Sequence, residues 1–380
     1  MKTEFLSKKD KKLNSGLPGV DFEFLILLMI ILSLGTLMIY SASFPYAQAH
    51  YDDGGHYIKR QLIFLAIGLT IMLFMSKISI ELYKKISVGF YLLCSVLLLV
   101  VLFGGFSEGV AKRWLGIPGT PLSFQPSELM KLGIILMLSK YISDNQEEKK
   151  SLLREIIFPG IILFLACGLV LLEKHLSGTI IIAAIGLSIL FIGGTSVKKM
   201  SLIYGATALV GGALFLLTNS YALKRIESFL NPNADILSDK WQTTQGLYAI
   251  GSGGVFGLGF TNSRQKYSYV SEPQNDFIFT IWCEEMGFIG ATVLITLFLL
   301  LIVRGYKIAL NAKDSYSSLV AFGITSQVAI QTLLNMAVVT DLIPNTGISL
   351  PFFSYGGSSL VILLAEMGIL LSISRYSMRN

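Results

Sequence analysis

Ten apolar stretches, separated by shorter polar segments, run along almost the whole chain. Their lengths approach the roughly 20 residues that an α-helix needs to cross the hydrocarbon core of a bilayer. The pattern predicts an all-α polytopic membrane protein with ten transmembrane helices. These helices are expected over residues 22–43, 62–75, 88–103, 126–142, 156–172, 177–194, 202–218, 276–303, 317–340 and 360–374.

The composition excludes an ordinary soluble domain. Hydrophobic residues make up 53% of the chain and charged residues only 14%, whereas a soluble domain carries roughly 25% charged residues. The three cysteines all lie inside apolar stretches, so neither a disulfide framework nor a zinc site is indicated. The first stretch is too long for a signal peptide and lacks a small-residue cleavage site, so we expect it to remain as a helix.

The distribution of basic residues predicts the orientation. Ten spans place both termini on one side, and the termini with the loops on that side hold 19 of the 30 Lys and Arg residues. The opposite loops hold 10. Because cytoplasmic loops carry the excess of basic residues, both termini are predicted to be cytoplasmic. The net charge of +6 then reflects topology, and no nucleic-acid partner is expected.

One polar segment is much longer than the others. Residues 219–275 are predicted to form a large extracellular loop between the seventh and eighth helices. We therefore expect a cytoplasmic tail over 1–19, a single transmembrane domain over 20–375 and a short cytoplasmic tail over 376–380.

Charged side chains that interrupt the apolar pattern fall mainly in the outward-facing loops. Lys131 is predicted one turn inside the fourth helix, with Glu128 three residues earlier on the same face. An ionisable residue within a span is a functional candidate, because a central charge costs at least ~2.5–3.5 kcal/mol. Two interpretations stay open: a lysine that binds a phosphate, or a Glu–Lys pair that neutralises itself.

The other candidates also have two interpretations each. Arg113 and Trp114 are typical of an anchor at the membrane interface, but an arginine also suits the oxygens of a pyrophosphate. Arg60 presents the same choice. Asp276 is expected at the start of the eighth helix, where aspartate is a favoured N-cap.

Further polar residues favour structural roles. Glu284 and Glu285 lie deep in the eighth predicted helix and are expected to pair with Arg or Lys from neighbouring helices. His175 is interpreted as a loop residue and not a metal ligand. The glycine-rich stretch 251–259 lacks the spacing of a nucleotide-phosphate loop and indicates tight turns or a close helix approach. No cluster has the spacing of a metal site.

Five stretches together resemble the shape, elongation, division and sporulation (SEDS) family, which includes RodA and FtsW. They are KRW at 112–114, QPSELMK at 125–131, GLYAIGSGGVFGLGF at 246–260, SEPQNDFIF at 271–279 and LIPNTGISLPFFSYGGSSL at 342–360. The resemblance covers nearly the whole chain, from the first helix to the tenth. The run over 262–279 looks more like the FtsW and sporulation branch than RodA.

The resemblance implies an enzyme of the bacterial plasma membrane. Family members polymerise lipid II into peptidoglycan strands at the outer face, releasing undecaprenyl pyrophosphate, in cell division and cell-wall synthesis. They work with a class B penicillin-binding protein and with other divisome or elongasome proteins. The acid in the DFIF motif, here Asp276, is the family's essential residue. The chain departs from the family after the fifth helix, where EKHLSGT replaces an acidic-Pro-Asp-Leu-Gly-like sequence, so no role is carried over for that loop.

The implied chemistry assigns roles to the outward-facing residues. Asp276 would accept a proton as general base, and Arg60, Arg113 and Lys131 would stabilise the leaving pyrophosphate. Trp114 and Glu128 are further candidates for contact with lipid II. No cofactor is certain; magnesium or manganese held by a carboxylate and the pyrophosphate stays open. A lipid II flippase and a purely structural scaffold are the rival functions, and the gathering of polar residues at the outer end favours the enzyme.

Overall fold

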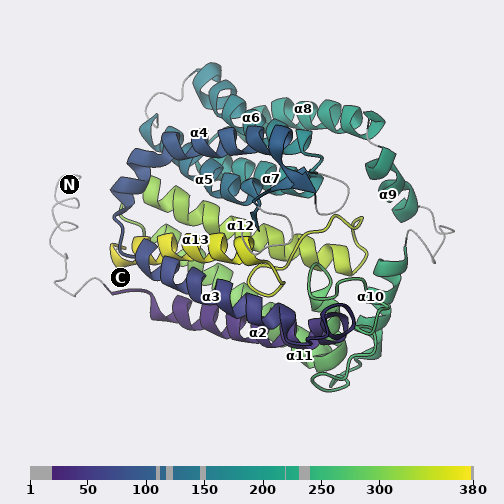
Figure 1. Ribbon diagram of the computed structural model, residues 1–380. Helices are drawn as coiled ribbons and strands as arrows, with labels where there is room; N and C mark the ends of the chain where they lie inside the picture. The colour runs from purple at the N-terminus through teal and green to yellow at the C-terminus, as the bar shows by residue number, and fades with distance from the viewer. Residues whose placement is uncertain are drawn as a thin grey trace.

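Long helices that run side by side dominate the computed structural model (Figure 1). The structure describes residues 19–107, 112–116, 123–145, 151–218, 220–230 and 240–377. The helices are α2 (Phe22–Tyr51), α3 (His56–Met75), α4 (Ile80–Gly104), α5 (Pro126–Asp144), α6 (Phe158–Leu172), α7 (Leu176–Ile192), α8 (Val197–Thr218), α9 (Ser220–Leu230), α10 (Trp241–Ser252), α11 (Ile278–Leu310), α12 (Ser315–Val339) and α13 (Gly357–Arg375). A π-helical turn, Leu153–Ile157, leads directly into α6.

Every apolar stretch expected to be helical overlaps a helix of the structure, which confirms the all-α membrane class. Within the described residues, seven helices are long and apolar enough to cross a membrane. They are α2, α3, α4, α6 with its π-helical turn, α11, α12 and α13. α7 is apolar but shorter.

Two helices form the centre of the bundle. Of the most apolar 18 residues of each helix, 61% are buried in α12 and 72% in α13, against 17% in α3. The long apolar side chains left exposed on α3 and its neighbours suit contact with lipid, where they cost nothing. Polar side chains on α12 and α13 therefore lie inside the protein, shielded from the bilayer.

A small antiparallel sheet lies between α4 and α5, where the sequence pattern indicated only a loop. Strands β1 (Phe106–Ser107), β2 (Lys112–Gly116) and β3 (Ser123–Phe124) pair in that order. Trp114 is opposite Phe106, and Leu115 is opposite Phe124. The central strand therefore holds Arg113 and Trp114 close to the start of α5.

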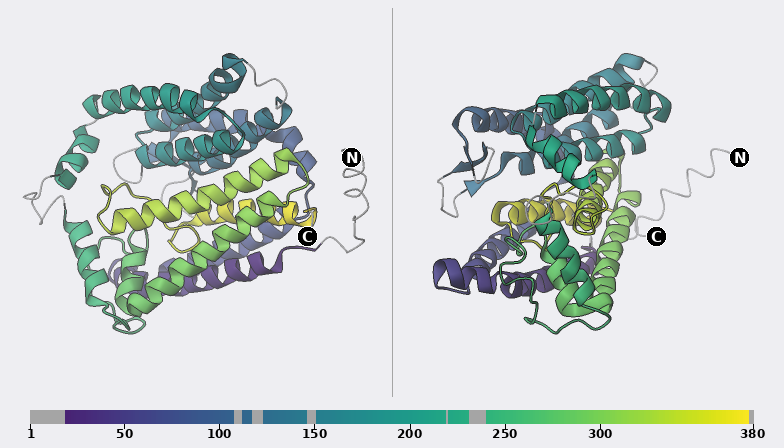
Figure 2. Two further views of the ribbon diagram at one scale, coloured as in Figure 1. Left: turned by 180° about the vertical axis from the view of Figure 1, so that it is seen from behind. Right: turned by 90° about the vertical axis from the view of Figure 1, so that its right-hand side faces the viewer.

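The predicted long loop over 219–275 contains two helices, α9 and α10. They lie at the end of the bundle opposite the start of α2 and the end of α13, as Figures 1 and 2 show. α10 packs along α11. Residues 219 and 231–239 of this segment, and most of the predicted tails over 1–19 and 376–380, lie outside the described residues.

α11 is broken at Gly287, whose φ of 66° and ψ of −167° are not helical. The break frees backbone groups on both sides of it, and the segment 254–259 bonds to them. Leu258 and Gly259 donate to the carbonyl groups of Glu284 and Glu285, at 2.9 and 3.0 Å. Phe288 and Ile289, after the break, donate to the carbonyl groups of Gly254 and Val255, at 2.9 and 3.2 Å.

Glycine is required where the two segments meet. A Cβ atom at Gly253 would overlap the carbonyl oxygen of Cys283, and one at Gly257 would overlap that of Glu285. Gly257 also has a φ of +81°, which side-chain-bearing residues rarely adopt. The close approach predicted from the glycine-rich stretch is confirmed.

Candidate functional site

Asp276 lies just before α11 and does not belong to it. The helix begins at Ile278, and its N-cap residue, Phe277, makes no side-chain capping bond. The prediction that the helix starts at Asp276, and the alternative that this carboxylate caps it, are therefore wrong. The carboxylate is half-buried and makes no hydrogen bond with the described part of the chain.

The surroundings of Asp276 raise the pKa of its carboxyl group from 3.8 to about 6. Removal from water is the main cause, and the negative charge of Glu272 adds to it. The positive charge of Arg225 acts in the opposite direction. A carboxylate with this pKa is ionised at neutral pH and still binds a proton more readily than an exposed aspartate, which suits a general base.

The loop between α12 and α13 packs against Asp276. Gly347 in this loop has a φ of +71°, and a Cβ atom on it would lie 3.2 Å from Asp276 Oδ2. Glycine therefore allows the loop backbone to come next to the carboxylate. Farther along the loop, the backbone N–H of Tyr355 donates to the carbonyl group of Gln274 at 2.9 Å.

Three helices fix the backbone of this loop by donating to its carbonyl groups. The donors are Arg225 of α9 to Asn345 (2.8 Å), Ser177 of α7 to Thr346 (2.5 Å) and Asn335 of α12 to Ile348 (2.7 Å). The backbone on both sides of Gly347, which approaches Asp276, is thus bonded to three different helices.

Lys131 and Glu128 form an ion pair at the start of α5. Pro126 occupies the first turn of that helix, where its missing N–H removes no bond. Lys131 Nζ lies 2.8 Å from Glu128 Oε2, and the lysine side chain is only 2% exposed. The hydroxyl of Ser359, from α13, donates to the same carboxylate oxygen at 2.9 Å.

Glu366 of α13 is a second buried acid in this region. Its carboxylate accepts a hydrogen bond from the amide of Gln327 on α12, at 2.8 Å. Both side chains are fully buried. The charged groups of Lys131 and Glu128 interact electrostatically with Glu366. The helices α5, α12 and α13 therefore contribute to one polar cluster.

Arg113 reaches the turn between α6 and α7, where it donates to the carbonyl oxygen of Lys174 at 2.5 Å. In the same turn, Nδ1 of His175 lies 3.2 Å from the amide nitrogen of Gln125. Burial, with the charges of Arg113 and Lys131, lowers the pKa of His175 to about 3. His175 is a loop residue, as predicted, and lies in the positive field of both cations.

Glu173 in this turn is buried and keeps its proton more readily than an ordinary glutamate. Burial raises the pKa of its carboxyl group to about 8, although the charge of Arg113 opposes the shift. At neutral pH it is therefore mostly neutral, so it does not cancel the positive charge of Arg113 and Lys131.

Arg60 lies apart from these groups. It is half-buried near the start of α3 and forms no hydrogen bond or ion pair with any residue the structure describes. One turn earlier, the ring of Tyr57 meets that of Tyr355 edge to face, with centroids 5.0 Å apart. The start of α3, to which Arg60 belongs, therefore packs against the loop between α12 and α13 through Tyr57.

The predicted residues therefore fall into two groups. Arg113 and Lys131 are brought together around His175, whereas Asp276 lies with Arg225 and Glu272. The start of α7 connects the groups, because it follows His175 and holds the loop next to Asp276. Trp114 is half-buried beside Arg113 on β2.

The sequence patterns do not identify two residues of this region, Arg225 and Asn335. Arg225 lies in the segment 219–275, which is predicted to be a loop. The only feature that marks it in the sequence is its position next to another basic residue, Lys224. Asn335 carries a polar amide inside an apolar stretch, and this alone marks it as a candidate functional residue. His175 is expected as a loop residue without an assigned role, and the effect of Arg113 and Lys131 on it is not visible in the sequence.

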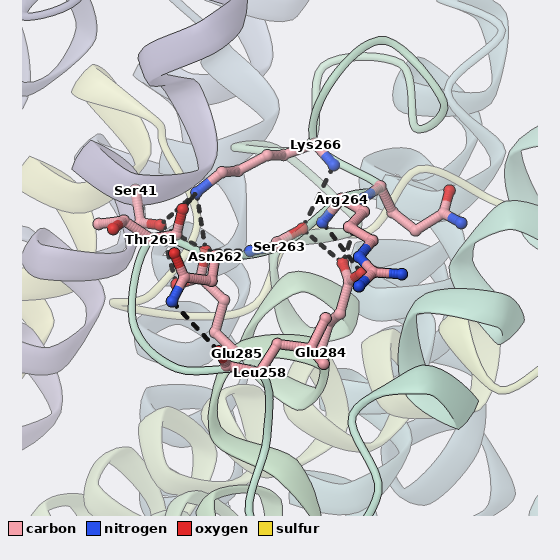
Figure 3. A network of polar contacts seen from close by, with 10 residues as sticks. Ser41, Leu258, Thr261, Asn262, Ser263, Arg264, Lys266, Glu284 and Glu285 are labelled. Carbon is pink, nitrogen blue, oxygen red and sulfur yellow. Dashed lines mark hydrogen bonds and ion pairs between the residues drawn. The ribbon is translucent and has the colours of Figure 1, made fainter.

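A separate buried network surrounds the break in α11 (Figure 3). Lys266 Nζ lies 2.9 Å from Glu285 Oε1, and the two side chains are 2% and 0% exposed. Ser41 of α2 donates to both oxygens of Glu285, at 2.6 and 2.8 Å. Lys266 also donates to Ser41 (3.1 Å) and to the carbonyl group of Thr261 (2.7 Å), so each of its three N–H groups has an acceptor.

Glu284 is bonded by the same extended segment. It accepts hydrogen bonds from the hydroxyl of Ser263 and from the backbone N–H groups of Arg264 and Gln265, the latter two at 3.0 and 3.3 Å. The expected pairing with a basic side chain is confirmed for Glu285, but its partner Lys266 comes from a loop segment and not from a neighbouring helix. Glu284 is bonded instead by hydroxyl and backbone N–H groups. The partners of both acids come mainly from the segment 252–266, which folds back onto α11.

The sequence matches the family model for FtsW, RodA and SpoVE, described as "Cell cycle protein", over residues 22–379. It is 40% identical to "Stage V sporulation protein E" of Bacillus subtilis, over 94% of this chain and 97% of the relative. It is 37% identical to "Probable peptidoglycan glycosyltransferase FtsW" of Trichlorobacter lovleyi, over 93% of each chain.

Solved structures show the same fold. A chain of a peptidoglycan synthase complex superposes with a TM-score of 0.77 at 25% identity, over 94% of this chain and 98% of that one. The rod shape determining protein RodA of Thermus thermophilus superposes with a TM-score of 0.70 at 26% identity, over 95% and 99%. The higher identities to the sporulation protein and FtsW agree with the predicted branch. The chain therefore belongs to the FtsW/RodA/SpoVE family, the SEDS proteins, and is a multi-pass bacterial membrane protein.

Proposed function

We propose that this chain is a peptidoglycan glycosyltransferase that polymerises lipid II into glycan strands of the cell wall. The observation that carries the proposal is the half-buried carboxylate of Asp276, which has a pKa of about 6 and no hydrogen bond within the described part of the chain. It lies beside a loop that three helices hold in place. The peptidoglycan glycosyltransferase named among the relatives supports this activity.

Asp276 acts as general base in the proposed reaction. The hydroxyl oxygen of the acceptor sugar attacks the anomeric carbon of the donor, and the bond from that carbon to the pyrophosphate breaks. Asp276 takes the hydroxyl proton, and undecaprenyl pyrophosphate leaves as an anion. One carboxylate is enough because the leaving group does not need a proton, unlike in glycoside hydrolysis.

Cations near the start of α5 stabilise the leaving group. Arg113 and Lys131 share a region where Glu173 is mostly neutral and His175 is uncharged, so neither of these two groups cancels the positive charge. Glu128 offsets the charge of Lys131 in their ion pair, so the net positive charge of the region comes mainly from Arg113. We assign the pyrophosphate to this region, with Trp114 and Glu128 beside it. Arg60 lies nearer the loop of Tyr355 and would contact a different part of lipid II.

The same proposal includes the arrangement in the membrane. Ten helices cross the bilayer, both termini are cytoplasmic, and the segment 219–275 is extracellular within a single domain over 20–375. The position of α9 and α10 at the end of the bundle opposite the start of α2 and the end of α13 supports this (Figure 2). The likeness to a chain of a peptidoglycan synthase complex supports a class B penicillin-binding protein as partner.

A divalent cation would need the substrate as a ligand. Among the described residues, no group of three or more His, Cys, Asp or Glu side chains could hold a metal ion. If magnesium or manganese takes part, a single carboxylate and the oxygens of the pyrophosphate would hold it. The ion would then offset the charge that develops on the leaving group.

The test is polymerisation of lipid II by the purified protein together with its partner. We expect Asp276→Asn and Asp276→Ala to fold normally and to form no strands. Glu272→Gln, which removes a carboxylate in the same loop, should keep full activity at pH 8. Full strand synthesis by both Asp276 variants would disprove the base. Transport of labelled lipid II across vesicles without polymer would favour a flippase instead.

A further inference from the structure

Asn335, a fully buried residue of α12, connects the two backbone segments that meet at Asp276. Its amide nitrogen donates to the carbonyl oxygen of Asp276 at 2.8 Å and to the carbonyl oxygen of Ile348 at 2.7 Å. An amide NH₂ group has two hydrogens, so one serves each carbonyl. A single side chain thus sets the distance between the segment of Asp276 and the loop of Gly347.

The orientation of this amide is determined by its partners. Turning it over would place its oxygen against two carbonyl oxygens, and three acceptors would then face one another. The observed orientation leaves Asn335 Oδ1 buried without a hydrogen-bond partner. An unpaired buried acceptor lowers stability, so packing alone does not account for an asparagine at this place.

The backbone of Asp276 depends on few other contacts. Its side chain makes no hydrogen bond with the described residues, and the helix that follows begins two residues later without a side-chain cap. The bond from Asn335 is therefore what ties the carbonyl group of Asp276 to the central helix α12. A shift of that carbonyl would move the carboxylate on the same residue relative to Gly347.

We propose that Asn335 is the positioning residue for Asp276, holding the carboxylate at the distance from the loop 342–350 that the reaction requires. This inference rests on the proposed function, because it assigns Asp276 as the base. Asn335 acts through the backbone and does not contact the substrate in this role. It therefore affects turnover more than substrate binding, since a misplacement of about 1 Å can cost ~100-fold in rate.

The experiment compares three variants with the wild type in the polymerisation assay with lipid II and the partner protein. Asn335→Asp keeps the shape but replaces both N–H donors with an acceptor, and Asn335→Leu removes the amide altogether. Thr332→Val is the matched control. Thr332 is on the same helix and 3% exposed, and its hydroxyl, like Asn335 Oδ1, is buried without a hydrogen-bond partner, so it forms no hydrogen bond to the carbonyl group of Asp276. Thermal unfolding reports whether each variant is folded.

For both Asn335 variants we expect kcat to fall about 10- to 100-fold, while KM for lipid II changes less than threefold. The pH at which activity is half-maximal on the acid side should also move, because Asp276 enters a new environment. Thr332→Val should match the wild type in all three quantities. A purely structural asparagine would instead lower the amount of folded protein and leave the pH midpoint unchanged.

The outcomes separate this inference from the proposed function. Wild-type protein that forms no strands would overturn the proposed function and the inference with it. An active wild type with an inactive Asp276→Asn, but with Asn335→Asp at full kcat, would overturn the inference alone. So would a loss in the Asn335 variants that follows the loss of folded protein with an unchanged pH midpoint.

Discussion

The ammonium group of Lys266 lies 2.9 Å from a carboxylate oxygen of Glu285, and both side chains are withdrawn from solvent. The pair joins the segment before Asp276 to α11 beside its break. Burying two charges is costly, and their mutual attraction offsets the cost only when every hydrogen bond is made. Ser41 and Thr261 complete those bonds, so the network holds the segment in one arrangement.

Lys266→Met should destabilise the protein strongly, because it leaves the charge of Glu285 buried without a cation. Removing one partner of a buried pair costs about 3–5 kcal/mol. The double variant Lys266→Met with Glu285→Gln removes both charges and should recover most of the loss, as measured by thermal unfolding in detergent. A single variant as stable as the wild type would contradict the assigned ion pair.

Lys131 and Glu128 should respond differently from this structural pair. Lys131→Met should lower both stability and strand synthesis, since it removes the ion pair and the proposed phosphate ligand together. Adding Glu128→Gln should restore stability but not activity. Unfolding temperature and polymerisation rate, measured on the same preparations, check this. Recovery of both quantities in the double variant would mean that the pair is only structural.

The pH dependence of strand synthesis should report on Asp276. The base works in its ionised form, so the rate should fall as the pH drops below about 6, the pKa of this carboxyl group. Glu272 raises that pKa and Arg225 lowers it. Glu272→Gln should therefore move the acid-side midpoint to lower pH, and Arg225→Gln should move it to higher pH. Rate profiles between pH 4.5 and 8 test the two directions, and shifts of the same sign would refute the assignment.

Two glycines separated by a single residue should tolerate alanine very differently. A Cβ atom at Gly251, within α10, would meet nothing within 4 Å, whereas one at Gly253 would overlap a carbonyl oxygen of α11. Gly251→Ala should be neutral or stabilise by up to ~1 kcal/mol. Gly253→Ala should destabilise by ~1–3 kcal/mol through forced backbone shifts. Equal unfolding temperatures for the two variants would rule out the close approach.

The helical part of the fold was predictable because the bilayer restricts the length and composition of a span. The sheet was not, since β1 and β3 have only two residues each, too few to show any period. Helices α9 and α10 were missed because they lie in a segment with no long apolar run. The break at Gly287 is not predicted, because apolar stretches lie on both sides of it and a single glycine does not by itself end a helix.

For the site, the sequence could indicate residues but not their partners. Asp276 and Lys131 stand out as charges at the edges of apolar runs. Their separation into two groups depends on how the loop 342–350 packs against α7, α9 and α12, which no local pattern encodes. The partner of Glu285 was likewise beyond reach, since Lys266 comes from a segment that sequence alone presents as an ordinary loop.

The interlocking of segment 254–259 with the broken α11 has a practical consequence for protein engineering. To exchange the segment 219–275 between relatives, one would normally cut the chain where this segment meets the apolar helices on either side. Here such a cut separates donors from acceptors, because backbone groups of residues 284–289 bond to those of 254–259. A chimera should therefore fold only if residues 253–289 are transferred as one piece, together with Ser41 of α2, which bonds to Glu285 and Lys266.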